Sequence, residues 1–529
     1  MRRRRFIGAT AAALALPSLA HGDRYTLLKY VPGGDLPSVD PIQVPSYETR
    51  SHGFMVFDTL YGQAGAGQGY AATPQMVAGH NVESDGRKWT LTLRDGLLFH
   101  DGSRVLARDC VASIRRWGAR DLFGQTLLQR TDELIALDDK TVVFRLRKPF
   151  AMLPDALGKF GTQMCPIMPE RLAATDPYKP IREVTGSGPF RFKADEQLAG
   201  SLHVYERFDH YIPRNQGNAD FVSGPKMAHF ERIEWHIIPD AASALEALLS
   251  GEVDWVEYPM DDALTTVRHD RRIKLQKIGS AGWWGLMRPN HLHPPFDNPA
   301  IRRAVMGALT QSDFMTAAIG TDPSLWQVPT GYFPPSTPMA SNAGLELLTG
   351  ARHLDRVRGD IEAAGYSGER VAVILPATLW RARIFGEIAA DVLRKVGMTV
   401  DEQIMDNATW ARQLVNMKPP SEGGWSIFCT SQQGTDALSP ASHAALRGNG
   451  VKAYTGWPKC PELETLRDQW LDAADFDARR AIVRRLQEQA FVDVPYYPLG
   501  TFYPSTAYRS DLTGVLDGQA IFWNVQRQV

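Results

Sequence analysis

The sequence predicts an α/β fold of two lobes, with a strand-rich subdomain inserted into the first lobe. The chain has 529 residues, which is too long for one compact core. Segments in which a helix stops at a glycine and a strand follows occur on both sides of residue 282, at 240–259 and at 385–405. Between residues 69 and 187, short alternating strands and turns dominate instead.

The first twenty residues have the pattern of an export signal. Four arginines precede a short alanine-rich apolar stretch that ends in Ser18-Leu19-Ala20, a small-x-small cleavage site. The apolar stretch is too short to span a bilayer, and no cysteine follows it that could carry a lipid. Residues 3–7 fit the twin-arginine pattern, and an ordinary secretory signal is the alternative. We therefore expect a protein that is soluble and periplasmic after cleavage.

Charge and cysteine content exclude two classes of protein. Residues 1–20 contain four arginines and no acid, so their removal changes the formal charge from -1 to -5 and leaves no basic face for nucleic acid. Four cysteines in so long a chain do not form a disulfide scaffold. A bridge between Cys429 and Cys460 stays open.

The inserted region predicts two hairpins and a helix. Residues 88–103 alternate apolar and polar side chains and turn at Asp95-Gly96, which predicts a hairpin. Residues 132–147 predict a second hairpin across Asp138-Asp139. Between them, apolar residues at helical spacing from Leu106 to Trp117 predict a helix.

The αβ units carry start and stop signals. Asp240 can cap a helix that Gly251 ends, and a strand follows from Val253. Residues 385–405 repeat the order of helix, glycine and strand. Asp297 and Pro299 open another helix, and residues 461–500 predict two helices and a closing strand.

These elements predict a division of the chain into four parts. We assign an export signal, a discontinuous first lobe, its inserted subdomain and a second lobe. The ranges are 1–20 for the signal; 21–68, 188–281 and 501–529 for lobe I; 69–187 for the insertion; and 282–500 for lobe II.

Sequence motifs of catalysis are missing. The chain contains no Gly-x-Ser-x-Gly, no His-Glu-x-x-His, no Cys-x-x-Cys and no Walker loop. The glycine cluster at residues 62–70 lacks the spacing of a dinucleotide site. We therefore predict no catalytic residue, no metal site and no cofactor.

The order of several motifs along the chain resembles a known family. The motifs are FDTLYG, WTLTLRDGLLFHDGSRVLARDCVASI, GSGPFRF, ALLSGEVDWVE, NHLHPPFDNPAIRRAV, the helix-Gly-Met-x-Val unit and the arginine-rich helix before Pro495. Together they resemble the family 5 extracellular solute-binding proteins of ABC importers, the peptide/nickel-binding group. The resemblance covers essentially the whole mature chain. It implies a two-lobed, type II-like periplasmic binding protein that closes on a solute. It also implies a monomer that docks on an inner-membrane permease and its ATPases.

Near residue 290 the family pattern has a strand, an Asn, a spacer, Pro-Pro-Phe and a helix. His291 and His293 fall in the spacer, and we interpret them as loop residues because a metal needs further ligands. Trp283 and Trp284 lie on the preceding strand, where alternation puts them on opposite faces. We predict that one is buried and that the other faces the ligand.

The family's peptide binders often carry an aspartate shortly after the position of Cys429, and it pairs with the peptide's amino terminus. Here Thr430, Ser431, Gln432 and Gln433 follow, and the nearest acid is Asp436. Either Asp436 supplies the counter-charge, or the ligand has no free ammonium group. Gln432 and Gln433 are further candidate ligand-binding residues.

A loop–helix junction near residue 380 supplies the last candidates. Trp380 could stack on the ligand and Arg381 could pair with a carboxylate; packing at a helix start and a solvated charge are the alternatives. Three functions remain open. The first is a receptor for a peptide or peptide-like solute, the second a receptor for a metal chelate or other solute, and the third a secreted hydrolase.

Overall fold

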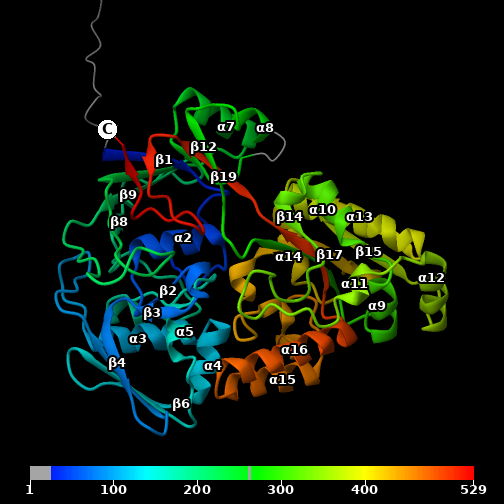
Figure 1. Cartoon of the computed structure of the whole chain (residues 1–529), viewed down its shortest axis with the longest axis horizontal. Coiled ribbons are helices and arrows are strands. Elements are labelled where there is room, and N and C mark those ends of the chain that lie inside the picture. Colours follow the sequence, from blue (N-terminus) through cyan, green and yellow to red (C-terminus); the bar gives the residue numbers. More distant parts are fainter. Residues whose placement is uncertain (1–25, 260–263, 529) are drawn as a thin grey trace, which may run out of the picture.

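The computed structural model describes residues 26–259 and 264–528. The predicted export signal, residues 1–20, lies outside these described residues. Within them, no helix combines the length and the apolar character that crossing a membrane requires. The chain forms two α/β masses (Figure 1), one coloured mainly blue to green and the other mainly yellow to red.

A seven-stranded mixed sheet forms the framework of the first lobe. Strand β1 pairs in parallel with β10 and β11, whereas β9 and β19 run antiparallel to their neighbours. The sheet therefore joins the start, the middle and the end of the chain. Its order is β12 (Ile273–Lys277), β19 (Ser505–Arg509), β11 (Trp255–Val256), β1 (Leu27–Val31), β10 (Arg232–His236), β9 (Leu202–Arg207) and β8 (Phe190–Phe192). The same lobe contains α2 (Tyr47–Val56), α7 (Ala241–Ser250), α8 (Leu264–Val267) and the pair β20 (Leu512–Thr513) and β21 (Gln526–Arg527).

A six-stranded sheet forms the second lobe. Strand β15 is parallel to β16 and β17, and β13 is antiparallel to β17 and β18. The order is β14 (Trp326–Gln327), β18 (Tyr497–Phe502), β13 (Trp283–Pro289), β17 (Ile427–Gln433), β15 (Arg370–Pro376) and β16 (Thr399–Met405). The helices are α9 (Pro299–Met306), α10 (Gln311–Ile319), α11 (Glu346–Thr349), α12 (Leu354–Ala363), α13 (Trp380–Lys395), α14 (Asn407–Leu414), α15 (Pro461–Asp472) and α16 (Phe476–Asp493).

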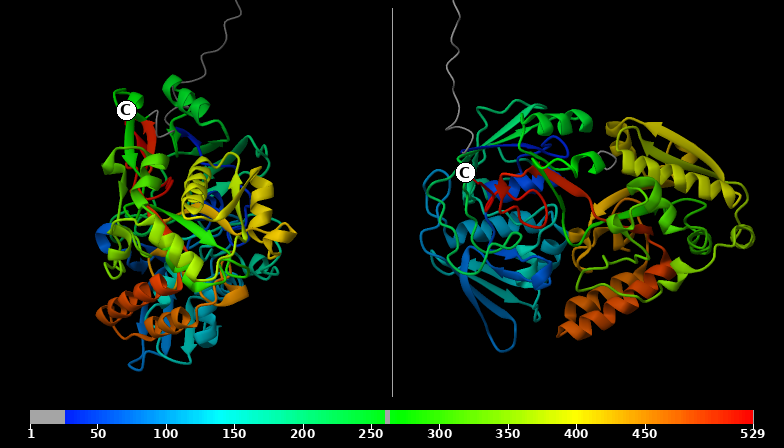
Figure 2. Two further views of the ribbon diagram at one scale, coloured as in Figure 1. Left: turned by 90° about the vertical axis from the view of Figure 1, so that its right-hand side faces the viewer. Right: turned by 45° about the horizontal axis from the view of Figure 1, so that its top comes forward.

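The inserted region contains a separate four-stranded antiparallel sheet. Its order is β4 (Val77–Val82), β5 (Lys88–Leu93), β7 (Thr141–Leu146) and β6 (Thr131–Ala136), with α3 (Ala107–Gly118), α4 (Leu122–Arg130), α5 (Leu153–Gly158) and α6 (Glu170–Ala173). The short pair β2 (Tyr61–Gln63) and β3 (Ala72–Pro74) leads into it. One apolar core extends from Phe123 in the insertion to Trp470 in the second lobe. The insertion therefore packs against the second lobe, and Figure 2 shows the cyan and orange helices facing each other.

The chain passes between the two large sheets after β12 and after β18. The predicted boundary at 282 falls between β12 and β13, whereas β18 continues to Phe502, two residues beyond the predicted boundary at 500. Gly279 and Gly282 have φ angles of 72° and 63° at the first passage. A Cβ on Gly282 would lie 2.9 Å from the carbonyl oxygen of Phe502, so a larger residue does not fit there. The division into domains stays a prediction.

Several local predictions are confirmed. Asp240 accepts a hydrogen bond from the backbone N–H of Ser243, and Gly251 ends α7 with φ 82°. The second unit, α13 followed by β16, and the closing elements α15, α16 and β18 are also present. One cap was wrong by a residue, because the side chain of Asn298, not that of Asp297, accepts from Ala300 at the start of α9.

The hairpin predicted across Asp95-Gly96 was wrong. Strand β5 ends at Leu93, and its partners are β4 on one side and β7 on the other. Residues 97–99 form no strand, although Leu98 makes an isolated bridge with Arg104. The Asp-Gly turn is present, but β5 pairs with β4, which precedes it, and with β7, which comes about fifty residues later in the chain.

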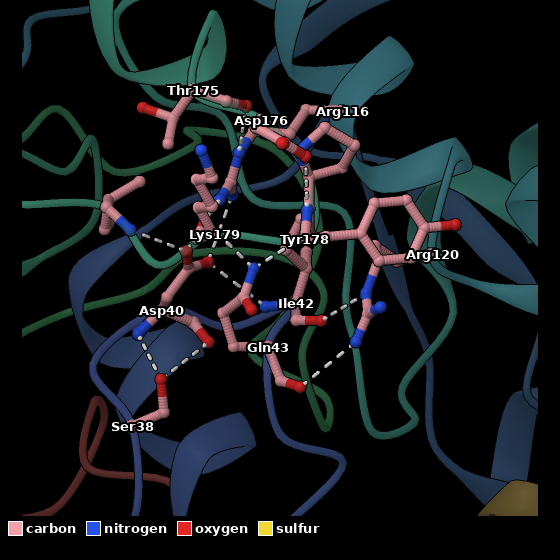
Figure 3. A network of polar contacts seen from close by, with 12 residues as sticks. Ser38, Asp40, Ile42, Gln43, Arg116, Arg120, Thr175, Asp176, Tyr178 and Lys179 are labelled. Carbon is pink, nitrogen blue, oxygen red and sulfur yellow. Dashed lines mark hydrogen bonds and ion pairs between the residues drawn. The ribbon is translucent and has the colours of Figure 1, made fainter.

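A buried ion pair fixes the segment that leads into α2 (Figure 3). The carboxylate of Asp40 accepts from Arg116 Nη1 at 3.1 Å and Nη2 at 2.7 Å, and from the backbone N–H of Ile181 at 3.0 Å. Arg116 also donates to the carbonyl oxygens of Thr175 and Lys179. Every guanidinium nitrogen of Arg116 and both carboxylate oxygens of Asp40 therefore have partners, which holds residues 38–43 against α3.

Candidate functional site

A cavity of about 690 Å³ lies between the first lobe with its insertion and the second lobe. Its wall includes Pro45 and Tyr47 near the start of α2, and charged residues on both sides: Asp121, Asp155, Lys159, Asp436 and Arg479. This volume is within the range of about 300–1,000 Å³ that is typical of small-molecule sites. The charged groups must pair with each other or with a ligand, because burying an unpaired charge is costly.

Tyr47 bonds the first lobe to the second. Its hydroxyl donates to Asp436 Oδ2 at 3.0 Å and accepts from the backbone N–H of Gln433 at 3.0 Å. Burial raises the pKa of Asp436, and the Arg50 and Lys159 cations oppose that rise. Asp436 is thus already close to a hydroxyl donor and two cations.

Arg50 lies one turn further along α2 and is completely buried. Ser46 caps this helix by accepting from Thr49, which sets the direction in which Tyr47 and Arg50 project. The guanidinium carbon lies 4.0 Å from the ring centroid of Phe160, and Nη1 donates to Gln433 Oε1 at 2.6 Å. Nε and Nη2 have no partner in the described part of the chain. The second lobe therefore supplies the hydrogen-bonding side chain of this buried cation.

Asp121 and Lys159 form a satisfied pair on the insertion side. Asp121 caps α4 by accepting from Phe123 and Gly124, both at 2.9 Å. Its other oxygen meets Lys159 Nζ at 2.5 Å, and Lys159 also donates to the carbonyl of Thr162. This carboxylate has little capacity left for a ligand.

Asp155 and Arg479 line the same cavity from opposite sides. Asp155 lies on α5 of the insertion and Arg479 on α16 of the second lobe. The pKa of Asp155 is raised to about 6, because the effect of burial exceeds the opposing effect of the Arg479 charge. Arg479 Nη2 makes a long contact of 3.4 Å with the carbonyl of Ala473, and its Nε has no partner among the residues described. The structure shows no ion pair between Asp155 and Arg479, both of which are described.

The predicted site residues on β17 and β13 fall in different positions. Gln432 and Asp436 line the cavity, whereas Gln433 is buried behind it and holds Arg50. Trp284 is 4% exposed and packs on His443 and Tyr496 in the core of the second lobe. Trp283 is half-buried on the opposite face.

Trp283 contacts the first lobe across the interface. Its ring lies 5.2 Å from that of Tyr47 and 5.7 Å from that of Tyr258. Alternation along the strand therefore separates the two tryptophans as predicted. Neither is among the residues that line the 690 Å³ cavity, so ligand stacking by Trp283 stays a prediction.

Trp380 and Arg381 begin α13 and also lie outside the lining of this cavity. Trp380 is 43% exposed, and the Arg381 guanidinium lies 4.3 Å from its ring centroid. Their ligand-binding role stays a prediction. Sequence reasoning missed Tyr47, Arg50, Asp155 and Arg479, since no motif surrounds them.

The histidines and cysteines have local partners or are buried. His293 pairs with the carbonyl of Met417 at 2.8 Å, and burial lowers the pKa of His291. All four cysteines are free and buried, so the open Cys429–Cys460 bridge is not formed.

Comparisons with known proteins agree with this architecture. The model of the bacterial extracellular solute-binding proteins, family 5 Middle, matches residues 71–441. The chain belongs to this family. It is 31% identical over 526 residues to a probable peptide ABC transporter periplasmic-binding protein, y4tO, of Sinorhizobium fredii. That alignment covers 98% of this chain and 97% of the relative.

Solved structures of the family confirm the two-lobed fold. The periplasmic binding protein AgaA of A. tumefaciens R10, in complex with agropinic acid, has a TM-score of 0.78 at 18% identity and covers 95% of this chain and 99% of its own. DppA of Helicobacter pylori, in complex with the peptide STSA, has a TM-score of 0.78 at 20% identity, with coverages of 95% and 98%. The predicted family and fold class are confirmed, and the protein is a solute-binding protein of family 5.

Proposed function

We propose that this protein is the periplasmic receptor of an ABC importer and that it captures a peptide or peptide-like solute between its lobes. The observation that carries this proposal is the cavity of about 690 Å³, whose polar wall comes from both lobes. Tyr47 and Arg50 bond to Asp436 and Gln433 across the interface, so closing the lobes and forming the cavity are one event. The relative y4tO, named as a probable peptide ABC transporter periplasmic-binding protein, supports the ligand class.

The receptor has no need of turnover. A solute that stabilises the closed form is bound because its contacts favour that form over the open one. In this proposal the closed protein, as a monomer, then docks on a membrane permease with its ATPases. The export signal predicted at residues 1–20 delivers the protein to the periplasm. Asp436, predicted from the sequence as a candidate counter-charge, bonds Tyr47 across the interface.

Native mass spectrometry of the exported protein tests the proposal. We expect a one-to-one complex whose released ligand has the fragmentation pattern of a peptide or amide-linked amino acid. At a hundredfold excess over Kd, the ligand adds about 2.7 kcal/mol to the free energy of unfolding. A released metal chelate would support the second ligand class instead, and catalytic turnover of peptides or esters would identify a hydrolase.

Two matched variants locate the binding in the cavity. Ser439→Trp fills the cavity, because Ser439 is part of its wall, whereas Ser201→Trp adds the same side chain at an exposed turn of the first lobe. We expect the first variant to be purified without ligand and the second to retain it. Equal ligand retention by both would place the binding site elsewhere.

A further inference from the structure

The three carboxylates that face the cavity differ in the hydrogen-bond donors and cations that surround them. Asp121 is fully bonded by two backbone N–H groups and Lys159. Asp436 accepts from Tyr47 and lies near the Arg50 and Lys159 cations. A ligand ammonium that approached Asp121 or Asp436 would be repelled by the protein cations that already lie near these carboxylates.

Asp155, in contrast, has no side-chain partner in the described part of the chain that neutralises its charge. It receives no hydrogen bond from another side chain of the described residues, and Arg479, on the facing helix α16, is the charged group that acts on it. Arg479 in turn leaves its Nε without a partner in the described chain, although this atom is buried. Two unlike charges thus face the cavity from the two sides, and neither neutralises the other by direct contact.

Electrostatics restricts what can lie between them. A lone ammonium that pairs with Asp155 is repelled by Arg479, and a lone carboxylate that pairs with Arg479 is repelled by Asp155. A group that carries both charges on one carbon satisfies both residues at once. Carboxylates bind guanidinium groups through paired N–H donors, and Arg479 lines the cavity with an Nη2 group whose contact with the carbonyl of Ala473 is long, at 3.4 Å.

We propose that Asp155 and Arg479 bind a free amino-acid head group, an ammonium and a carboxylate on the same carbon, at one end of the solute. This inference rests on the proposed function and narrows its ligand class. The peptide-like solute is then joined through a side chain, as in a γ-linked peptide, because an ordinary α-linked peptide separates its two terminal charges. Asp436 closes the lobes through Tyr47 and leaves head-group recognition to Asp155.

Two isomeric dipeptides provide the test. γ-Glutamyl-alanine and α-glutamyl-alanine have the same atoms and net charge, but only the γ isomer has its ammonium and a carboxylate on one carbon. By isothermal titration at pH 7.5 we expect the γ isomer to bind about tenfold or more tightly than the α isomer, since each desolvated charge pair contributes strongly to affinity. Equal binding, or preference for the α isomer, would overturn the inference.

Five variants show which residues cause the preference for the γ isomer. Asp155→Asn and Arg479→Gln should each remove most of the γ-over-α preference, and their double variant should lose little more, because they bind one group. Arg479→Lys should restore part of it. Asp436→Asn should weaken both isomers by the same factor and leave the ratio unchanged. A ratio that depends on Asp436 and is insensitive to Asp155 would assign the ammonium to Asp436.

The binding results that would overturn this inference differ from those that would overturn the proposed function. If Ala-Ala-Ala and α-glutamyl-alanine bind and the γ isomer has no advantage, the receptor function stands and the head-group site does not. If none of these probes binds, both proposals are overturned. The melting temperature of each variant, measured alongside, shows that the variants are folded.

Discussion

Asp40 and Asp155 are both largely buried carboxylates beside an arginine, yet their surroundings differ completely. Asp40 accepts from two nitrogens of Arg116 and from the backbone of Ile181. Asp155 receives no such bond from another side chain of the described residues, and Arg479 acts on it only through its charge. The protein itself supplies the hydrogen-bond partners of the Asp40 carboxylate, as expected for a structural residue. The Asp155 carboxylate keeps hydrogen-bonding capacity for a ligand, as expected for a binding-site residue.

The same substitution at both positions should therefore have opposite effects. Asp40→Asn leaves the Arg116 guanidinium buried opposite an amide whose NH₂ cannot accept its bonds. Breaking a buried pair by removing one partner costs about 3–5 kcal/mol. We expect a loss of this size in the free energy of unfolding, measured by urea denaturation followed by circular dichroism.

An exposed ion pair serves as the control. Arg207 Nε and Asp209 Oδ1 are 2.8 Å apart, and the side chain of Asp209 is 74% exposed. Asp209→Asn should change the free energy of unfolding by less than about 1 kcal/mol. If Asp40→Asn is as mild as this control, the pair does not hold the segment before α2 in the way that Figure 3 indicates.

Asp155→Asn should instead stabilise the ligand-free protein at neutral pH. The pKa of Asp155 is about 6 in the folded protein, against 3.8 for an ordinary Asp. Because the folded form holds the proton more tightly, ionisation of Asp155 costs stability as pH rises from 3.8 to 6. A shift of about two units corresponds to a gain on the order of 1–3 kcal/mol when the charge is removed.

The pH dependence identifies the source of this gain. The difference in melting temperature between Asp155→Asn and the parent should be largest above pH 6, shrink as pH falls towards 4, and vanish below that. Arg479 is the charged group that faces Asp155 from α16. A destabilised variant at pH 7.5 would show that Asp155 is satisfied like Asp40, and the contrast would be lost.

Local chemistry made much of the fold predictable. Asp240 and Gly251 determine where α7 begins and ends, and Gly397, with φ 88°, separates α13 from β16. Such signals act within a few residues, so they can be read from the sequence. The hairpin at Asp95-Gly96 was wrong for the complementary reason. A favourable turn does not decide which strand β5 pairs with, because β7 competes from a distant segment.

The candidate site was predictable only in part. Asp436 and Gln432 came from a family motif on one strand, and both line the cavity. Asp155 and Arg479 lie more than three hundred residues apart, on helices of different lobes, and only the folded structure shows that both line one cavity. Their surrounding sequences carry no pattern that distinguishes them from ordinary helix surface charges.

Asp436 is intermediate between Asp40 and Asp155: it has a side-chain partner, but that partner, Tyr47, comes from the other lobe. Tyr47→Phe keeps the ring beside Trp283 and removes the hydroxyl that bonds Asp436 and Gln433. We expect the free energy that favours lobe closure to fall by about 0.5–1.5 kcal/mol. Solute affinity should then be several-fold weaker, and the unfolding midpoint should be unchanged. Tyr258→Phe is the control, since its ring also contacts Trp283 but its hydroxyl bonds Gln519. Equal affinities for both variants would mean that Asp436 does not close the lobes through Tyr47.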